Sequence, residues 1–245
     1  MNTLRRFYAP PERIRGEVVV LSPEETHHLV RVVRLGVGDQ VLVCDGRGRN
    51  LAAKVRNLEG NEAVLQVLGE LAPMGESPLD FTLGIGLAKG EAMDGVIYQA
   101  TEMGVKKIVP FISSRSERVT PERAARRRAK WERLAQESLK SCQRSYLPEI
   151  VPVQEFAGVL AGPEEVKLLF WEEERGGGIS KYFSQTRPAG VRLLIGPEGG
   201  FSPEEVALAR ERGYQIASLG PRRLKVETAA LAALTLIQHA WGDLP

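Results

Sequence analysis

The chain has very little cysteine, and this narrows its chemistry. Only Cys44 and Cys142 occur among 245 residues, far apart and without the CxxC or Cys/His spacing of a zinc site. We therefore expect a reducing compartment, no structural metal, and thiols that pack inertly instead of acting in catalysis. His27 and His28 adjoin each other, but no third ligand lies near them in the sequence, so we expect no metal there either.

Long apolar runs are absent as well. No segment approaches the roughly 18 consecutive apolar residues of a membrane helix. Residues 1–10 also lack the apolar stretch of a secretory signal. We expect a cytoplasmic protein without a membrane partner. With 43% hydrophobic and 26% charged residues, the composition is typical of a globular protein of one large or two small domains.

The net charge of +2 is too small to indicate a nucleic-acid partner by itself. Its distribution is more informative, because the segment 115–133 holds eight basic residues against three acidic ones. Arginine clusters suit phosphate, since the planar guanidinium can bond two oxygens at once. An ordinary solvated helix face explains the same segment equally well.

The first 70 or so residues predict short strands, turns and one helix. Ser22 is placed to cap that helix, with Pro23 in its first turn and Glu25 closing a capping box, and Gly36 marks its end. Strand-like segments are found at 17–21, 40–44, 51–55 and 63–68. Together they predict a small barrel, followed by a linker at 74–78.

Beyond the linker, strands and helices alternate, which predicts an α/β fold with a largely parallel sheet. Gly104 and Gly213 stand where helices end, and Ser202 begins a second capping box. The expected strands are 81–87, 105–112, 166–171, 191–195 and 215–219. The expected helices are 93–103, 121–141, 203–212 and 227–241.

In such a sheet, ligands bind beyond the carboxyl ends of the strands, and three of these ends are unusual. The loop Gly196–Gly200 holds three glycines and a proline, which let backbone amides approach a ligand closely. The segment Leu219–Ala229 is basic and leads into the last helix, so Glu227 and Thr228 lie near a helix N-terminus. Leu169–Glu172 ends a third strand, although aromatic residues after a buried strand are more typical of packing than of a cofactor site.

Two segments resemble known nucleotide-binding motifs but do not match them. Gly84–Gly90 nearly forms a dinucleotide fingerprint, but its third glycine comes one residue late and Lys89 stands in its place. The Gly196–Gly200 loop lacks the Gly-Lys-Ser/Thr ending of a P-loop. Nicotinamide and ATP chemistry are therefore disfavoured.

The pairing of LLIGPEGGFSPEE (193–205) with LGPRRLKVETAALAAL (219–234) resembles the family of bacterial 16S rRNA uridine-N3 methyltransferases (RsmE), within the SPOUT class of knotted methyltransferases. The segments 89–116 and 27–39, together with RRFYAP near the N-terminus, are similar too. The chain departs from the family pattern at Arg223, where we expect isoleucine, and at Lys225 and Val226, where we expect arginine and threonine.

The resemblance implies an α/β fold class: a SPOUT trefoil-knot α/β domain at 73–245 with a small N-terminal PUA-like β-barrel at 1–72 that binds RNA. It also implies S-adenosyl-L-methionine as cofactor, a homodimer with each active site near the subunit boundary, and 16S rRNA or the small ribosomal subunit as partner. The cofactor-binding residues carried over are Phe170, Ile195, Gly196, Pro197, Glu198, Gly199, Gly200, Leu219, Gly220, Arg222, Leu224, Glu227 and Thr228.

Methylation of uracil N3 requires the N3 proton to leave, but it needs no covalent cysteine intermediate. Glu198 is the candidate to orient or deprotonate the base, and a purely structural acceptor in the loop is an equal alternative. Arg222 and Lys225 are candidates to stabilise O2 or O4 of the uracil anion, or to hold phosphate.

For RNA capture we expect basic and aromatic side chains of the N-terminal region to act together. Phe7 and Tyr8 beside two arginines can stack on bases, or they can anchor the barrel. The candidates are Arg5, Arg6, Tyr8, His27, Arg31, Arg34 and Arg115. Three alternatives stay open: a non-catalytic RNA-binding or ribosome-assembly factor, a methyltransferase acting on another RNA, and one acting on a small molecule.

Overall fold

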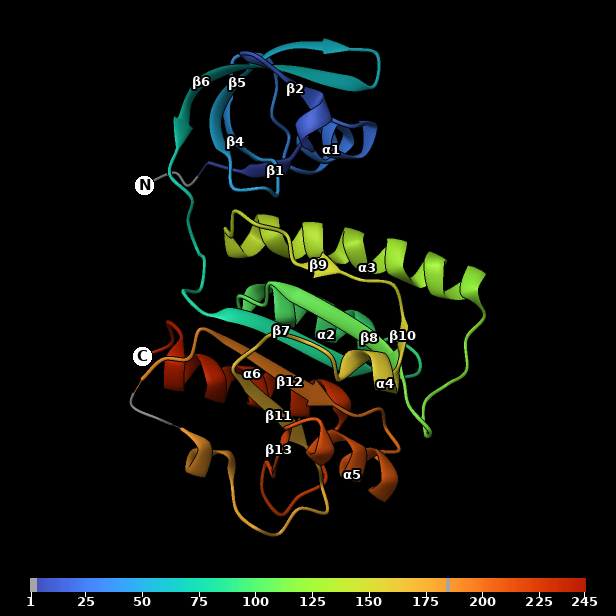
Figure 1. Ribbon diagram of the computed structural model, residues 1–245. Coiled ribbons are helices and arrows are strands. Elements are labelled where there is room, and N and C mark those ends of the chain that lie inside the picture. Colours follow the sequence, from blue (N-terminus) through green and yellow to red (C-terminus); the bar gives the residue numbers. More distant parts are fainter. Residues whose placement is uncertain (1–3, 184–185) are drawn as a thin grey trace. The chain divides into compact units, whose positions relative to one another are not determined.

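The computed structural model of the protein describes residues 4–183 and 186–245, and these divide into two units (Figure 1). Unit 1 takes the described residues up to Glu76 together with Gln136–Leu147. Unit 2 takes Ser77–Ala135 and the described residues from Pro148 onward. The first unit is therefore built from two segments that lie far apart in the sequence.

Unit 1 is formed around a six-stranded sheet in the order β1-β4-β5-β6-β3-β2. β1 runs parallel to β4, and the other neighbours are antiparallel. Alternate residues face the core, so that Val41 and Val43 are buried while Leu42 between them is half-buried. The strands are β1 (Arg6–Tyr8), β2 (Ile14–Arg15), β3 (Val18–Val20), β4 (Gln40–Cys44), β5 (Asn50–Glu59) and β6 (Glu62–Leu71).

The predicted first helix is present as α1 (Pro23–His27), continued by a π-helical turn over His28–Val32, and a short 3-10 turn at Pro11–Arg13 precedes it. The Ser22 hydroxyl caps α1 by accepting a hydrogen bond from the amide of Glu25 at 3.2 Å. The expected capping box is only half formed among the described residues. The Glu25 carboxylate instead accepts from the amide of Tyr8 and from Nζ of Lys140, at 3.1 and 2.5 Å.

The segment Gln136–Leu147 is tied into unit 1 by buried hydrogen bonds. The hydroxyl of Ser145 accepts from Nδ2 of Asn50 and from the amide of Met74, at 2.7 and 2.8 Å. The Glu76 carboxylate accepts from the amides of Ser145 and Tyr146 at 2.7 and 2.9 Å, and from the Arg144 guanidinium at 3.0 Å. The expected linker is thus fastened within unit 1 as far as Glu76. The division of the chain at residue 72 stays a prediction.

Unit 2 is built on a seven-stranded, fully parallel sheet in the order β10-β8-β7-β12-β11-β13, with β9 also paired to β8. The longer strands fall where the sequence predicts them. The strands are β7 (Asp80–Gly86), β8 (Lys107–Ile112), β9 (Glu149–Ile150), β10 (Gln154–Glu155), β11 (Val166–Phe170), β12 (Gly190–Ile195) and β13 (Gln215–Ala217). All six residues of β12 are buried, as expected for a central strand of a parallel sheet.

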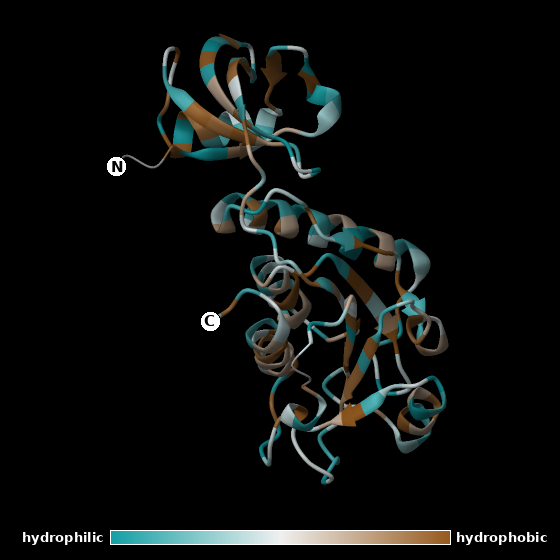
Figure 2. Ribbon diagram, turned by 60° about the vertical axis from the view of Figure 1, so that its left-hand side comes forward, coloured by the Kyte–Doolittle hydropathy of each residue, from teal (hydrophilic) through white to brown (hydrophobic). Residues whose placement is uncertain are grey.

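Helices cover both faces of this sheet. α2 and α6 contact each other, and α6 packs on β12. α4 and α5 pack against β8 and β13, with Phe111, Phe156 and Phe201 at the centre of that core. Figure 2 shows the sheet strands largely in brown, with teal on the helices around them. The helices are α2 (Ala92–Glu102), α3 (Pro121–Cys142), α4 (Phe156–Val159), α5 (Pro203–Glu211) and α6 (Val226–Trp241), and a 3-10 turn lies at Ile179–Tyr182.

The predicted helix ends of unit 2 are confirmed. Gly104 and Gly213 have φ of 78° and 83°, the left-handed conformation that ends helices at glycine. At Ser202 both hydrogen bonds of the capping box to Glu205 are formed. Glu205 also accepts from the amide of Ser114 at 2.7 Å, so the start of α5 holds the segment that follows β8.

The two cysteines differ in their surroundings. Burial raises the pKa of Cys44 to about 11, and its sulfur donates to the carbonyl of Phe7, so this thiol stays protonated at neutral pH. Cys142 is half-buried at the end of α3. Within the described residues, no three His, Cys, Asp or Glu side chains gather as a metal site, and no helix is long and apolar enough to cross a membrane.

Candidate functional site

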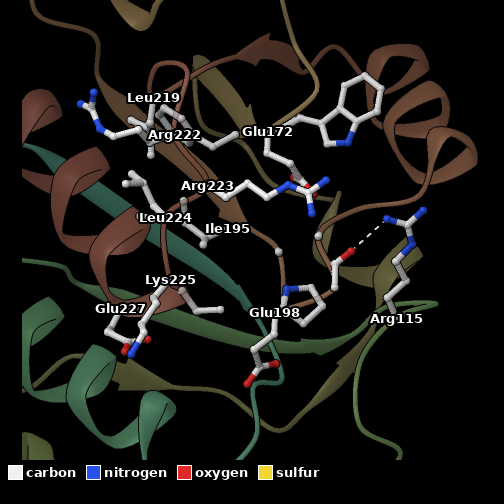
Figure 3. A pocket seen from close by; sticks show the side chains of 18 of the residues that line it. Arg115, Glu172, Ile195, Glu198, Leu219, Arg222, Arg223, Leu224, Lys225 and Glu227 are labelled. Atoms are coloured by element: carbon white, nitrogen blue, oxygen red, sulfur yellow. Dashed lines mark hydrogen bonds between the residues drawn. The ribbon is translucent and has the colours of Figure 1, made fainter.

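A cavity of about 650 Å³ opens in unit 2 beyond the carboxyl ends of β11, β12 and β13 (Figure 3). It lies where ligands are expected in a parallel sheet. The three strand ends singled out from the sequence all contribute to its wall. The lining residues are Ala92, Arg115, Phe170, Trp171, Glu172, Glu173, Ile195, Gly196, Pro197, Glu198, Gly199, Gly200, Leu219, Gly220, Arg222, Arg223, Leu224, Lys225, Val226, Glu227 and Ala229.

The loop after β12 requires glycine for steric reasons. Gly200 has φ of 68°, and a Cβ there would collide with the carboxylate of Glu172. A Cβ at Gly199 would lie 2.8 Å from Cβ of Arg115. The amide of Gly200 donates to the carbonyl of Pro197 at 2.8 Å, which closes a tight turn. The loop is thus a compact turn, buried at Gly196, Pro197 and Gly200 and exposed at Glu198 and Gly199, that packs between two charged side chains.

Arg115 holds this loop from the side of β8. Its Nη1 donates to the carbonyl of Gly199 at 2.9 Å, drawn as the dashed line in Figure 3. Arg115 is predicted from the sequence to bind RNA, and the structure places it in the wall of the cavity with part of its guanidinium bonded to the loop. Its role in binding RNA stays a prediction.

Glu198 is exposed at the tip of the loop. Its Oε1 accepts a hydrogen bond of 2.7 Å from the backbone amide of Lys89, in the loop between β7 and α2. In Figure 3 the side chain points away from the group formed by Arg223 and Glu172. One oxygen of this carboxylate therefore joins two loops at the edge of the cavity.

The basic segment after β13 forms the opposite wall. Gly220 turns the chain with φ of 107°, and Arg222, Arg223 and Lys225 are all exposed. Figure 3 shows Arg223 reaching over the cavity toward Glu172, whereas Arg222 extends away from it. Charge of both signs therefore lies around one opening.

α6 directs its N-terminus to the cavity. The helix begins at Val226 with Lys225 as N-cap, and the first helical hydrogen bond runs from the amide of Ala229 to the carbonyl of Lys225 at 2.8 Å. The preceding amides have no partner within the helix, so this end favours an acceptor or an anion. Glu227 lines the cavity as predicted, but Thr228 is exposed and lies outside its wall.

Trp171, Glu172 and Arg223 line the cavity, although none of them was among the site residues predicted from the sequence. Trp171 and Glu172 stand in the segment after β11 that is more typical of packing than of a cofactor site, and Arg223 was noted as a departure from a family pattern. The signal that could have identified Glu172 is its contact with Gly200, but that contact exists only in the folded chain.

The candidate RNA-binding residues of the N-terminal region lie in unit 1. Arg5, His27, Arg31 and Arg34 are exposed. Arg6 and Tyr8 are half-buried, and the Arg6 guanidinium donates to Oδ1 of Asn50. Phe7 is fully buried and packs edge-on against His28 at 5.9 Å, so the idea that Phe7 stacks on bases is wrong: strand alternation turns its ring into the core.

Comparison with known proteins gives these features a family. The profile described as "RNA methyltransferase domain" matches residues 75–238, and "RNA methyltransferase PUA domain" matches residues 21–68. Ribosomal RNA small subunit methyltransferase E of Synechocystis sp. is 33% identical over 95% of this chain and 76% of its own length. The protein of the same name from Bacillus subtilis is 29% identical over 89% of each chain.

Two solved structures are similar to this chain over nearly its whole length. A putative methyltransferase from Legionella pneumophila, in complex with the bound cofactor SAM, matches with a TM-score of 0.91 and 32% identity over 99% of this chain and 100% of its own. Ribosomal RNA small subunit methyltransferase E from Neisseria gonorrhoeae, bound to S-adenosyl methionine, matches with a TM-score of 0.89 and 31% identity, again over 99% and 100%.

The parallel sheet with its cavity and the matched domains define an RNA methyltransferase. The predicted fold class, a SPOUT trefoil-knot α/β domain with a small N-terminal PUA-like β-barrel, is confirmed. More narrowly, the chain belongs to the ribosomal RNA small subunit methyltransferase E family, as its resemblance to that family predicted.

Proposed function

We propose that this chain transfers the methyl group of S-adenosyl-L-methionine to N3 of a specific uridine in 16S rRNA of the small ribosomal subunit. The observation that carries the proposal is the convergence of three strand-end loops on one cavity. Its support from relatives is direct, because structures that match 99% of this chain hold S-adenosylmethionine. The relatives' names specify small-subunit ribosomal RNA, and the N3 position is what the resemblance of the segments 193–205 and 219–234 to the uridine-N3 methyltransferase family implies.

The cavity fits such a donor. Its volume falls within the roughly 300–1,000 Å³ of small-molecule sites. Backbone groups of Gly196–Gly200 and the free amides of α6 offer hydrogen bonds, and Phe170, Ile195 and Leu224 offer apolar contact. We assign cofactor binding to these residues with Leu219, Gly220 and Glu227. Thr228 lies outside the cavity wall, and its role in cofactor binding stays a prediction.

S-adenosylmethionine supplies an electrophilic methyl group on its sulfonium. The chain must then align uracil N3 with it and stabilise the charge left when the N3 proton departs. Lys225 is assigned to the developing anion at O2 or O4, because it lies at the cavity and at the N-terminus of α6. Arg222 extends away from the cavity and is assigned to an RNA phosphate. Glu198, bonded to the Lys89 amide, is assigned to orienting the loop against the base.

RNA capture is assigned to unit 1 through Arg5, Arg6, Tyr8, His27, Arg31 and Arg34, with Arg115 at the cavity. We further propose a PUA-like domain over residues 1–72 and a methyltransferase domain over 73–245. Two copies of the chain are proposed to assemble, each active site lying near the boundary between them. The reaction is assigned to the cytoplasm, because bacterial ribosomes assemble there.

Mapping methylated nucleotides in 16S rRNA from cells with and without this gene tests the reaction directly. We expect one N3-methyluridine to disappear on deletion and to return with the wild-type gene. Titration calorimetry with S-adenosylmethionine tests the site separately. Undetectable binding at millimolar donor would favour a non-catalytic RNA-binding factor, and full activity after loss of Arg5, Arg6 and Arg31 would favour a small-molecule substrate.

A further inference from the structure

The helix α3 carries more positive charge than its neighbours in unit 2 neutralise. One side of the helix is buried through Trp131 and Ala135. Beside it, Arg127 donates to the carbonyl of Ala88 at 2.8 Å, and its guanidinium lies 5.2 Å from the Trp131 ring. These contacts fix the orientation of the helix in unit 2 and therefore fix which residues face solvent.

Four basic side chains of this region are paired with acids. Glu117 binds both Arg123 and Arg127, at 2.7 and 3.3 Å. Lys130 pairs with Asp94, and Arg128 pairs with Glu132 at 3.0 Å. Glu117, Asp94 and Glu132 are thus each paired with cations of this region, so the charge of these four basic residues is largely cancelled.

Three arginines differ: Arg118, Arg126 and Arg133. All three are exposed, and no hydrogen bond or ion pair of their side chains is found among the described residues. Arg126 and Arg133 are seven residues apart, so they project from nearly the same face of α3 with a rise of about 10 Å between them. We call these three residues the α3 arginine face.

The α3 arginine face follows the cavity wall along the chain. Arg115 bonds to Gly199 in the cavity wall, and Arg118 follows three residues later. The connecting segment runs from the end of β8 to the start of α3 (Figure 1). It is held in place, because the amide of Ser113 donates to Oγ of Ser116 at 3.1 Å and the amide of Ser114 donates to Glu205 at 2.7 Å. Unpaired positive charge therefore extends from the cavity wall along one helix.

We infer that the α3 arginine face binds backbone phosphates of the RNA strand that enters the cavity. This inference rests on the proposed function and adds to it a surface outside both the cavity and unit 1. Arg126 and Arg133 on α3, with Arg118 in the segment just before it, present exposed guanidinium groups that suit the phosphates of an extended strand, since each can bond two oxygens. The surface is specific for backbone charge and reads no base.

The test compares the triple variant R118Q/R126Q/R133Q with the wild-type protein. Fluorescence anisotropy measures binding of an unmodified 16S rRNA transcript at several salt concentrations. Removing one arginine–phosphate interaction should reduce the slope of log K against log [salt] by roughly 0.7–0.9. We expect a slope shallower by about 2 and at least tenfold weaker binding at physiological salt, because more than one phosphate is no longer neutralised. The variant R118K/R126K/R133K keeps the charge and should keep most of the slope.

K106Q/R212Q is the matched control, because Lys106 and Arg212 are exposed cations of unit 2 that lie outside this face. It should leave the slope unchanged. An unchanged slope in the triple variant, or an equal change in the control, would overturn the inference. Calorimetry with S-adenosylmethionine distinguishes failure of the proposed function from failure of this inference. Wild-type protein that binds RNA but no donor would refute the proposed function. A normal donor affinity in the triple variant shows that only the RNA surface was altered.

Discussion

The Glu198 carboxylate is the residue whose role the geometry constrains most. A general base needs a free oxygen within reach of the N3 proton, whereas Oε1 of Glu198 already accepts from the Lys89 amide at 2.7 Å. Its other oxygen lies at the edge of the cavity and can still contact the base. A positioning role therefore accounts for the contact that is present and for the placement of an acid at the centre of a glycine-rich turn.

Glu198→Gln keeps an acceptor for Lys89 and removes the charge. We expect kcat to fall by less than tenfold, while Glu198→Ala should raise the KM for the donor and lower kcat further because the two loops separate. Single-turnover methylation at several pH values measures both. If glutamine were as damaging as alanine, with a loss of roughly 10²–10⁴ as for removal of a catalytic base, the positioning role would be wrong.

Gly200 is constrained by conformation and by space together. Gly200→Ala forces a left-handed φ of 68° on a residue with a Cβ, and the flexible Glu172 carboxylate must move aside to make room for that Cβ. The strain, about 1–3 kcal/mol, must be relieved by opening the loop. We expect donor affinity to fall by at least tenfold in calorimetry. Gly95→Ala is the control, because this position in α2 has open space and should be neutral or slightly stabilising. Equal affinities for G200A and wild type would contradict the assignment of this loop.

How far residues could be assigned from sequence depends on where their partners lie. The Gly196–Gly200 loop and the basic segment after Leu219 were predictable, because a glycine-rich or basic loop at the end of a strand indicates a binding site from the local sequence alone. Glu172 and Arg223 were not, since one faces Gly200 and the other reaches over the cavity only after three loops meet. The prediction that Phe7 stacks on bases was wrong for the opposite reason. Its neighbours Arg6 and Tyr8 resemble an RNA-binding group in the sequence, but alternation along β1 turns the ring of Phe7 into the core.

At the scale of elements, β12 contains a buried ion pair in the middle of the sheet. Arg192 donates to both oxygens of Glu164, at 2.9 and 3.0 Å, and to the carbonyl of Val159 at 3.0 Å. Arg192 is only 5% exposed. Burial opposes ionisation of Glu164, but hydrogen bonds from Arg192 and Thr82 outweigh it and hold the pKa of Glu164 below its ordinary value.

Glu164→Gln leaves the buried arginine without its counter-charge. We expect a loss of about 3–5 kcal/mol in the free energy of unfolding, measured by urea denaturation at pH 7. Glu149→Gln is the matched control, because its pair with Lys107 is exposed and should be worth about 0–1 kcal/mol. Because the pKa of Glu164 is lowered in the folded state, its contribution is present above the pKa of the unfolded chain and is lost as the pH falls through the folded value. The gap between variant and wild type should therefore narrow in acid, and a gap independent of pH would contradict this account.

The elements that sequence could predict are those that contain their own signals. β12 is apolar apart from Arg192, and α5 begins with a Ser-Pro-Glu-Glu capping box and ends before Gly213. β1, β9 and β10 were not predicted, because each has two or three residues and depends on hydrogen bonds to a distant strand. β1, for example, pairs with β4, which lies more than thirty residues later.

At the scale of the whole molecule, the two units do not follow a single cut in the sequence. Residues 136–147 belong to unit 1, although they follow the start of the parallel sheet. No local pattern could reveal this, since Asn50, Met74 and Glu76 select their partners in that segment only when both are folded. An N-terminal domain drawn from sequence alone therefore lacks part of its own structure.

Ser145→Ala in the full chain tests this dependence. The hydroxyl is fully buried, and its loss leaves the amide of Met74 without the acceptor it has now and Nδ2 of Asn50 with only the carbonyl of Ala72, at 3.3 Å. Each unsatisfied group costs about 1–3 kcal/mol, so unit 1 should lose stability selectively. Hydrogen exchange should quicken in β4, β5 and β6 while β7 and β12 keep their protection. Ser180→Ala, at an exposed position of unit 2, should change neither set.

A fragment of residues 1–76 extends the same argument, because it removes every hydrogen bond that Ser145, Tyr146 and Arg144 supply to Asn50, Met74 and Glu76. It also leaves Glu25 without Lys140, whose ammonium lies 2.5 Å from it in the full chain. We expect the fragment to unfold without a cooperative transition, or at a midpoint well below that of unit 1 in the intact protein, by circular dichroism during heating. If the fragment is as stable as unit 1 in the intact protein, residues 136–147 do not stabilise the barrel. A boundary near residue 76 is then sufficient to define the domain.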